Sequence, residues 1–315
     1  MRLIKILPVS SELYSEVVRI QNPIWPEFAT DENELHHRAT LDPTLRSQHW
    51  LANRNGEPVG LLEIGPVSGS YHPQRWTIDI SVEAAHRNNG VGKALYEFAR
   101  SEIAASEPLS ITCHVREGDE HSHRFAVSRG FSEAKRDYFS VLDLTKLDQA
   151  NLDAMLARPV PEDIKIVVGT DVDTPEFRKG LHDLFEEVRK DLPRALPPTP
   201  LTFEQFDSAF LDPTFKWTCS MFAMKSGKPV AMCVTFESPT EGHLLQGLTG
   251  VSRELRGAGL GTILKARLVK QSIAEGYKSI GTDNDIRNKT MVAINDRLGF
   301  EKRPSIIQMM WGTNE

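Results

Sequence analysis

An internal repeat constrains the fold of this chain more than any other feature of its sequence. The tetrapeptide Leu-Asp-Pro-Thr occurs at 41–44 and again at 211–214, and Arg-Gly-Phe at 129–131 is matched by Leu-Gly-Phe at 298–300. Four more residues recur at a spacing of 169: Val82 as Val251, Arg87 as Arg256, Gly90 as Gly259 and Gly92 as Gly261. Ordered matches at nearly constant spacing indicate a tandem duplication, so we expect the two halves to share one fold.

The two halves are expected to meet in a short linker. Residues 145–156 have helical hydrophobic spacing, and they are followed by Pro159 and Pro161, which do not continue a helix. A length of 315 residues also suits two domains of ordinary size. We therefore predict an N-terminal domain at 1–144, a linker helix at 145–161 and a C-terminal domain at 162–315.

Hydrophobic periodicity predicts the same order of elements in both halves. A short apolar strand and two amphipathic helices come first, and a hairpin follows around Asn55-Gly56 in one half and around 226–227 in the other. A longer strand, at 76–82 and again at 243–251, leads into a glycine-rich turn and a helix, and each half closes with strand, helix and strand. This order predicts an α/β fold in each half, a mixed, mostly antiparallel sheet flanked by helices.

Composition and charge exclude several classes of partner. Lysine and arginine total 37 against 43 aspartates and glutamates, a net charge of −6, which argues against a nucleic-acid-binding protein because such proteins present a basic face. No apolar run reaches the roughly 18 residues of a membrane span. The three cysteines, Cys113, Cys219 and Cys233, fit neither a disulfide framework nor a zinc motif. We expect a cytoplasmic protein with no membrane partner and no metal.

Two glycine-rich turns carry the clearest functional signal. They lie at 87–93 and 256–262, each between a strand and a helix, where N–H groups at the helix start bind anions such as phosphate. The first turn does not fit a P-loop, because Ala94 stands where that motif needs a hydroxyl. The second does not fit the G-x-G-x-x-G dinucleotide fingerprint, because Thr262 and Leu264 replace its last glycine. The pattern common to both is Arg-x-x-Gly-x-Gly.

This duplicated pattern follows the fourth strand, opens the third helix and precedes a terminal Leu-Gly-Phe element, and in these respects the chain resembles the GNAT N-acetyltransferase superfamily. The resemblance covers most of the chain. It implies that backbone amides of the turn bind the pyrophosphate of acetyl-CoA and that the pantetheine arm lies between splayed fourth and fifth strands. In the second half it assigns cofactor binding to Val251, Arg256, Gly257, Ala258, Gly259, Leu260 and Gly261. The equivalent residues of the first half are Val82, Arg87, Asn88, Asn89, Gly90, Val91 and Gly92.

The last helix of the second half adds two candidate cofactor ligands. The run 282–300 resembles the ending common in tandem GNAT chains, and it places Asn288 and Asn295 seven residues apart on one helix face, where their amides would bond the pantetheine arm. Asn288 fits a helix cap equally well. The first half has no matching asparagines. We therefore predict that the second half carries the reaction and that the first is a degenerate copy completing the substrate cleft.

The acid and the base are less clearly marked. Transfer of an acetyl group from a thioester needs a base for the attacking amine and a group that stabilises the departing thiolate. Many GNAT enzymes use a tyrosine of the last helix for the thiolate, but Ala126 and Asn295 stand at that position here. The candidates are Asn295 for the thiolate, and Glu237 or Asp79 for the base.

The leading prediction is an acetyl-CoA-dependent N-acetyltransferase that acetylates a small-molecule amine by direct attack. The alternatives are a mycothiol-synthase-like acetyltransferase, a non-catalytic acyl-CoA-binding sensor or interaction module, and a protein N-terminal acetyltransferase. Three carboxylates ahead of a proline-rich loop, Glu186, Glu187 and Asp191, would attract a cationic amine. Because a tandem chain can act as its own pseudo-dimer, we expect a monomer rather than a homodimer.

Overall fold

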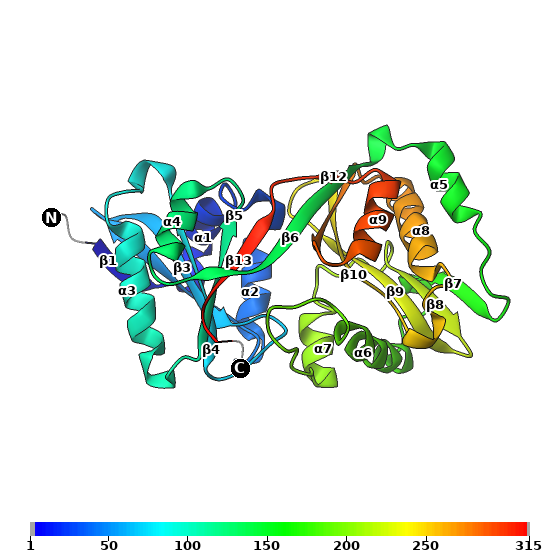
Figure 1. Ribbon diagram of the computed structural model, residues 1–315, viewed down its shortest axis with the longest axis horizontal. Helices are drawn as coiled ribbons and strands as arrows, with labels where there is room; N and C mark the ends of the chain where they lie inside the picture. Colours follow the sequence, from blue (N-terminus) through cyan, green and yellow to red (C-terminus); the bar gives the residue numbers. More distant parts are fainter. Residues whose placement is uncertain (1–3, 314–315) are drawn as a thin grey trace. The chain divides into compact units, whose positions relative to one another are not determined.

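Two compact units make up the protein in the computed structural model, which describes residues 4–313 (Figure 1). The N-terminal unit contains residues 4–136, 195–199 and 306–313, and the C-terminal unit contains 137–194 and 200–305. The units are therefore not two consecutive stretches of the chain. Each takes its last strand from the other half of the sequence.

The sheet of the N-terminal unit is mixed. Its strands are β1 (Ile4–Pro8), β2 (Gln48–Arg54), β3 (Glu57–Pro66), β4 (Arg75–Val82), β5 (Ser110–Arg116) and β13 (Ile306–Gly312). They lie in the order β1-β2-β3-β4-β5-β13, with β4 and β5 parallel and the other neighbours antiparallel. One parallel pair in an otherwise antiparallel sheet agrees with the sequence prediction.

Helices cover both faces of this sheet. They are α1 (Tyr14–Gln21), α2 (Glu32–Thr40), α3 (Val91–Ile103) and α4 (Glu120–Val127). Successive side chains of a strand point to opposite faces, and β3 shows this directly: Leu62 packs in a core with Leu95 of α3, whereas Leu61 packs in a separate core with Val17 of α1. The unit therefore has an α3/α4 face and an α1/α2 face.

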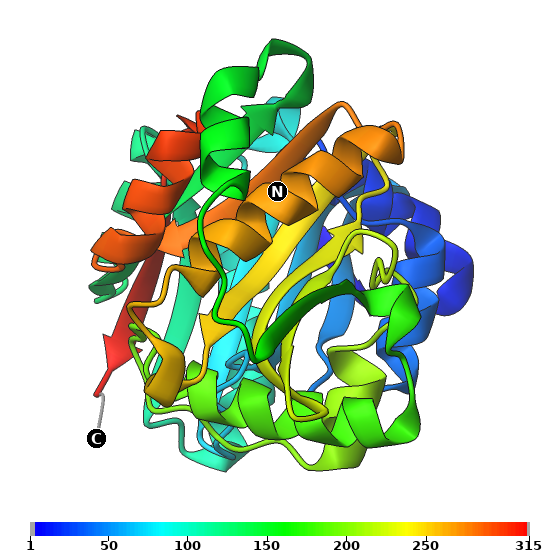
Figure 2. The same ribbon diagram turned by 90° about the vertical axis from the view of Figure 1, so that its right-hand side faces the viewer.

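The C-terminal unit repeats this arrangement. Its strands are the part of β6 (Ser132–Asp143) from Asp137 onward, β7 (Ile164–Val168), β8 (Met221–Lys225), β9 (Lys228–Glu237), β10 (His243–Val251), β11 (Ser279–Asp285) and β12 (Glu301–Lys302). The order is β6-β11-β10-β9-β8-β7, with β12 beside β6 and with β10 and β11 parallel. Its helices are α5 (Gln149–Leu156), α6 (Pro175–Arg189), α7 (Phe203–Ala209), α8 (Leu260–Ala274) and α9 (Lys289–Leu298). Figure 2 shows α8 and α6 on opposite sides of the sheet.

The closing strand of each half differs from the sequence expectation. In β6, Asp137 to Asp143 pair in register with β11, so this part of the first half completes the C-terminal sheet. Strand β13 pairs with β5 over Ile306 to Gly312 and completes the N-terminal sheet. Sequence periodicity identifies a strand but not its partner, which explains why the exchange was not foreseen. Within residues 4–313, no helix has both the length and the apolar character that a membrane crossing needs.

Candidate functional site

The two parallel strands of the N-terminal unit separate part-way along their length. Strands β4 and β5 pair from Arg75 with Ser110 to Thr77 with Thr112. Two residues further on, the backbone N–H of His114 donates to the side-chain carboxylate of Asp79, at 2.8 Å. The Asp79 carboxylate thus accepts the hydrogen bond that a backbone carbonyl of β4 would accept if the two strands stayed paired. Beyond this point the strands are splayed.

A cavity of about 800 Å³ lies along the splay. On the α3/α4 face it is lined by Ile80 and Cys113 with Tyr96 of α3, and on the α1/α2 face by Ser81 and His114. Because neighbouring residues of one strand point to opposite faces, these side chains show that the cavity passes through the sheet between β4 and β5. Two molecules can therefore approach one point from opposite faces.

The first glycine turn forms one end of this cavity. Gly90 caps α3 with a φ of 83°, a left-handed conformation that glycine adopts without strain, and a Cβ atom there would meet no heavy atom within 4 Å. Arg87 fastens the turn by donating from Nε to the backbone oxygen of Val82. Of the residues predicted for cofactor binding, those lining the cavity are Val82, Arg87, Asn88, Gly90 and Gly92. Val91 is buried in the core, and Asn89 donates to the backbone of Arg87.

Basic side chains surround the same end of the cavity. Lys93 of α3 and His121 of α4 line it, as does Arg129, whose guanidinium lies 3.4 Å from the centre of the Phe125 ring. Cations beside the N-terminus of α3 favour an anionic group such as a phosphate. The open space at Gly90, the exposed helix start and the charges of Lys93 and Arg129 would suit a phosphate group.

Asp79 and His114 form a pair where β4 and β5 separate, and His114 lines the cavity. The His114 ring nitrogen Nδ1 lies 2.9 Å from the second carboxylate oxygen of Asp79, and the side chains remain 35% and 26% exposed respectively. Asp79 thereby holds both the backbone and the ring of His114. The sequence marked Asp79 but missed His114, although both residues lie two positions beyond a paired threonine and so face each other.

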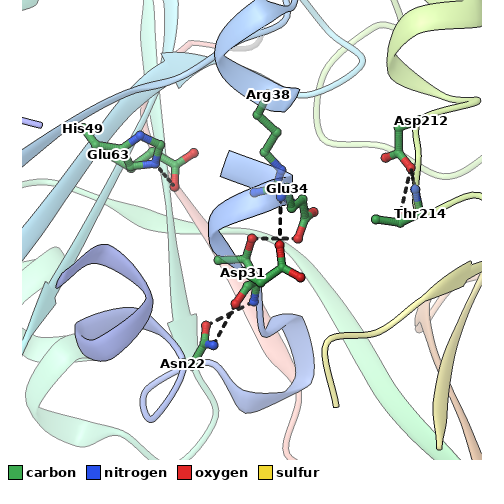
Figure 3. A network of polar contacts seen from close by, with 9 residues as sticks. Asn22, Asp31, Glu34, Arg38, His49, Glu63, Asp212 and Thr214 are labelled. Carbon is green, nitrogen blue, oxygen red and sulfur yellow. Dashed lines mark hydrogen bonds and ion pairs between the residues drawn. The ribbon is translucent and has the colours of Figure 1, made fainter. Parts of the chain in front are cut away.

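The loop between α1 and α2 walls the cavity on the α1/α2 face. Trp25 lines it, and Glu27 binds both terminal nitrogens of Arg116 at 2.6 Å. At the base of the loop, Asn22 donates to and accepts from the backbone of Thr30. Figure 3 shows this amide facing the start of α2, where Asp31 accepts from the backbone of Glu34. Hydrogen bonds therefore hold the loop at its base and at Glu27, and they fix Trp25 beside the cavity.

The second glycine turn has the same backbone but different surroundings. Gly257 and Gly259 have φ values of 84° and 78°, and Arg256 Nε donates to the backbone oxygen of Val251, as in the first turn. A Cβ atom at Gly259 would lie 3.8 Å from a guanidinium nitrogen of Arg158. Arg158 follows α5, and α5 packs against α8 and α9. The predicted linker helix therefore lies beside the second turn.

Comparison with protein families identifies the fold. The family model described as "Acetyltransferase (GNAT) family" matches residues 14–131 and again residues 181–300. The chain belongs to the GNAT acetyltransferase family. The two matched regions coincide with the two halves of the repeat, which confirms that the protein is a tandem GNAT chain with two GNAT domains.

Solved structures of similar fold cover the whole chain. A tandem GNAT protein from the clavulanic acid biosynthesis pathway is 20% identical with a TM-score of 0.77, and 98% of each chain is covered. A GCN5-related N-acetyltransferase from Sphaerobacter thermophilus is 16% identical with a TM-score of 0.73, over 99% of this chain and 98% of that one. At these identities the likeness is one of fold. No curated protein sequence matches the chain.

In the C-terminal GNAT domain, Asn295 takes part in a buried polar cluster. It is 3% exposed, and its amide accepts from Lys265 of α8 and donates to Asn284 of β11. Lys265 is itself 1% exposed, and burial lowers its pKa to about 8. At the repeat spacing of 169, Lys265 corresponds to Tyr96, which lines the cavity of the N-terminal domain. Aligning the halves residue by residue would have revealed this difference.

The other predicted residues of this GNAT domain have structural partners. Asn288 is the N-cap of α9 and accepts from the backbone of Met291, the capping role that the sequence left open. Glu237 ends β9 opposite Leu244, at the paired rather than the splayed end of β10, and it accepts from Tyr277 and Lys216. The distance along β10 from Leu244 to Val251, the last residue before the glycine turn, is about 23 Å at the usual strand rise. Glu237 thus lies far from the turn.

The carboxylates expected to attract an amine are engaged within the GNAT fold. Asp191 pairs with Arg253 and Arg256, which hold its pKa well below the usual range. Glu187 accepts from the backbone of Arg253, and Glu186 pairs with Arg189. Each of the three carboxylates thus has a partner within α6 or at the second glycine turn, and their attraction of an amine stays a prediction.

Proposed function

We propose that this protein is an acetyl-CoA-dependent N-acetyltransferase acting on a small-molecule amine, and that its N-terminal domain carries the reaction. The observation that supports this most is the cavity that crosses the N-terminal sheet, whose lining includes residues of the glycine turn and His114, the partner of Asp79. The proposal reverses the assignment made from the asparagines, because Asn288 caps a helix and Asn295 is bound to Lys265.

The α3/α4 face would hold the acetyl donor. The backbone N–H groups that open α3, together with Arg87 and Lys93, would bind its phosphates, and the cavity between β4 and β5 would take its pantetheine arm. Acetyl-CoA, when bound, supplies an acetyl group activated as a thioester. Cys113 lines this path, but burial raises the pKa of its thiol, so it remains protonated and is a poor nucleophile.

His114 would act as the general base on the amine. A protonated amine has no lone pair for attack, so a group within hydrogen-bond reach must accept its proton. With Nδ1 donating to Asp79, the neutral ring carries its acceptor lone pair on Nε2. Asp79 then acts as a positioning residue that fixes the ring and stabilises its protonated form, as the acid of a catalytic triad does for its histidine.

Charge on the α1/α2 face supports an amine acceptor. Glu83 lines the cavity and pairs with Arg19, while Asp79 and Glu63 lie on adjacent strands of the same face. Arg116 also lines the cavity on this face and is paired with Glu27, so both arginines of the lining here, Arg19 and Arg116, are neutralised by carboxylates and do not oppose the approach of an ammonium ion.

Matched glycine variants test which domain works. Valine at Gly90 or at Gly259 introduces the same left-handed strain, with φ of 83° and 78°, so the two variants share a folding penalty. We expect G90V to weaken acetyl-CoA binding at least about tenfold in calorimetry and to abolish thiol release with an amine panel, because its side chain fills the anion site. G259V should keep both activities. Loss of turnover in G259V but not in G90V would return the reaction to the C-terminal domain, and tight binding without thiol release on any amine would indicate a sensor.

A further inference from the structure

A row of two carboxylates, with a histidine at each end, crosses the N-terminal sheet beside the cavity. His49 of β2 lies directly opposite Glu63 of β3, and Glu63 lies directly opposite Asp79 of β4. Asp79 in turn binds His114 of β5. Residues directly opposite each other on antiparallel strands share one face, so the four side chains lie side by side on the α1/α2 face.

The contacts within the row are close. His49 Nε2 lies 3.8 Å from a carboxylate oxygen of Glu63, the contact drawn between them in Figure 3. His114 Nδ1 lies 2.9 Å from Asp79. Each histidine thus pairs with one carboxylate, and the two carboxylates are neighbours at the centre of the row. The row begins at His49, outside the cavity lining, and ends at His114, within it.

Two carboxylates directly opposite each other destabilise a sheet. Burial alone would raise the pKa of Glu63, but the neighbouring His49 and Ser47 side chains and the charge of Arg38 lower it to about 2. Glu63 is therefore ionised throughout the physiological range, beside Asp79. An unfavourable charge retained next to the proposed base, and compensated on its far side by His49, points to a role in the chemistry.

We propose that Glu63 is a positioning residue for acetyl transfer: its fixed negative charge, one strand behind Asp79, stabilises the protonated ring of His114 and so sets the pH at which His114 accepts a proton. This inference rests on the proposed role of His114. Among the charged groups that face the row, Arg38 of α2 lies beside Glu63, and Arg116 of β5, held by Glu27 of the α1–α2 loop, lies beyond His114. Glu83, which follows β4, lies on the same face and is paired with Arg19 of α1.

The sign of the effect follows from the charge. Replacing Glu63 by glutamine keeps the size of the side chain and removes a negative charge, so protonated His114 is less stable and loses its proton at a lower pH. Two strand spacings separate Glu63 from His114, about 10 Å. At that distance a unit charge moves a titration by about half to one pH unit in a partly solvated site. The acid limb of kcat/KM against pH should therefore move down by that amount in E63Q.

The test measures kcat/KM from about pH 5 to pH 9 with acetyl-CoA and the best amine from the panel. The set comprises the wild type, E63Q, E63D and H114Q, with E57Q as the control because Glu57 is exposed on the same strand. We expect E63Q to shift the acid limb down, E63D to restore it because the charge is kept, and E57Q to leave it in place. Melting temperatures are measured alongside, since a purely structural role would change those and leave the limb unmoved.

The outcomes separate this inference from the proposed function. An unmoved limb in E63Q, together with loss of the limb in H114Q, overturns the role of Glu63 while His114 stands as the base. A limb that survives in H114Q overturns the base itself. If E63Q does not fold, E63A tests the same residue: alanine also removes the negative charge, so the limb should move down, and an unmoved limb counts against the inference.

Discussion

Replacing Lys265 by methionine is expected to change how the stability of this protein depends on pH. The Lys265 side chain is 1% exposed, and burial lowers its pKa from the ordinary 10.5 to about 8. Its Nζ donates to Asn295 and lies 3.7 Å from the sulfur of Met291. Methionine has a similar length and no charge, so K265M removes this titration while filling the same space.

The sign and size follow from the protons bound in each state. Between pH 8 and pH 10.5 the unfolded chain keeps the Lys265 proton while the folded protein releases it, so the free energy of unfolding rises with pH. At about 1.4 kcal/mol per pH unit, the wild type should gain about 3 kcal/mol relative to K265M across this window. Below pH 8 the wild type carries a buried ammonium. K265M removes that cost but leaves Asn295 without its donor, a loss of about 1–3 kcal/mol, so the two proteins should be of similar stability at neutral pH.

Urea denaturation at intervals between about pH 7 and pH 10 measures the difference. The matched control is K270M, because Lys270 is an exposed lysine of the same helix and its loss leaves the buried cluster intact. We expect the free energy of unfolding to increase with pH by the same amount in the wild type and in K270M, and by less in K265M. Parallel curves for the wild type and K265M would refute the argument, since they would show that Lys265 releases no proton in the folded protein over this window.

Three further outcomes are expected. Replacing Glu27 by glutamine should cost about 1–3 kcal/mol in chemical denaturation at neutral pH, because it breaks the half-buried pair with Arg116. Burial alone would raise the pKa of Glu27, but Arg116 holds it below its usual value, so the wild type should lose this advantage over E27Q as the pH falls through that pKa. Replacing Gly60 by alanine should lower the melting temperature, at a cost of about 1–3 kcal/mol, because the new Cβ would lie 2.9 Å from a methyl of Val91. All three cysteines should react slowly with a thiol reagent in the native protein and rapidly after unfolding, because burial raises the pKa of each thiol.

The duplicated pattern in the sequence was sufficient for the fold of each half. Recurrence of Arg87, Gly90 and Gly92 at a spacing of 169 placed a strand, a turn and a helix correctly in both domains, because a left-handed glycine at the start of a helix is a local requirement. The partners of the closing strands β6 and β13 were not predictable in the same way. Pairing is decided by long-range contacts that leave no periodic trace in either strand.

The residues of the candidate site also differ in whether the sequence alone could identify them. Asp79 could be found from the sequence because it is a carboxylate on the strand before the turn, and Asn288 could be recognised as a possible cap from its place at a helix start. His114 and Glu63 could not, because their meaning depends on the register that sets them beside Asp79. Asn295 was misjudged as an open ligand, since only packing shows that Lys265 reaches its amide.

The sequence by itself determined that the protein is one α/β unit used twice, because glycine turns and hydrophobic periodicity act over a few residues. The tertiary structure decided how the two copies differ. Tyr96 borders a cavity in the N-terminal domain, whereas Lys265 at the matching position is buried against Asn295, and Arg158 lies beside the second turn. Whether the space beside a glycine turn stays open depends on contacts between side chains from distant segments of the chain. The local sequence around the turn does not determine those contacts.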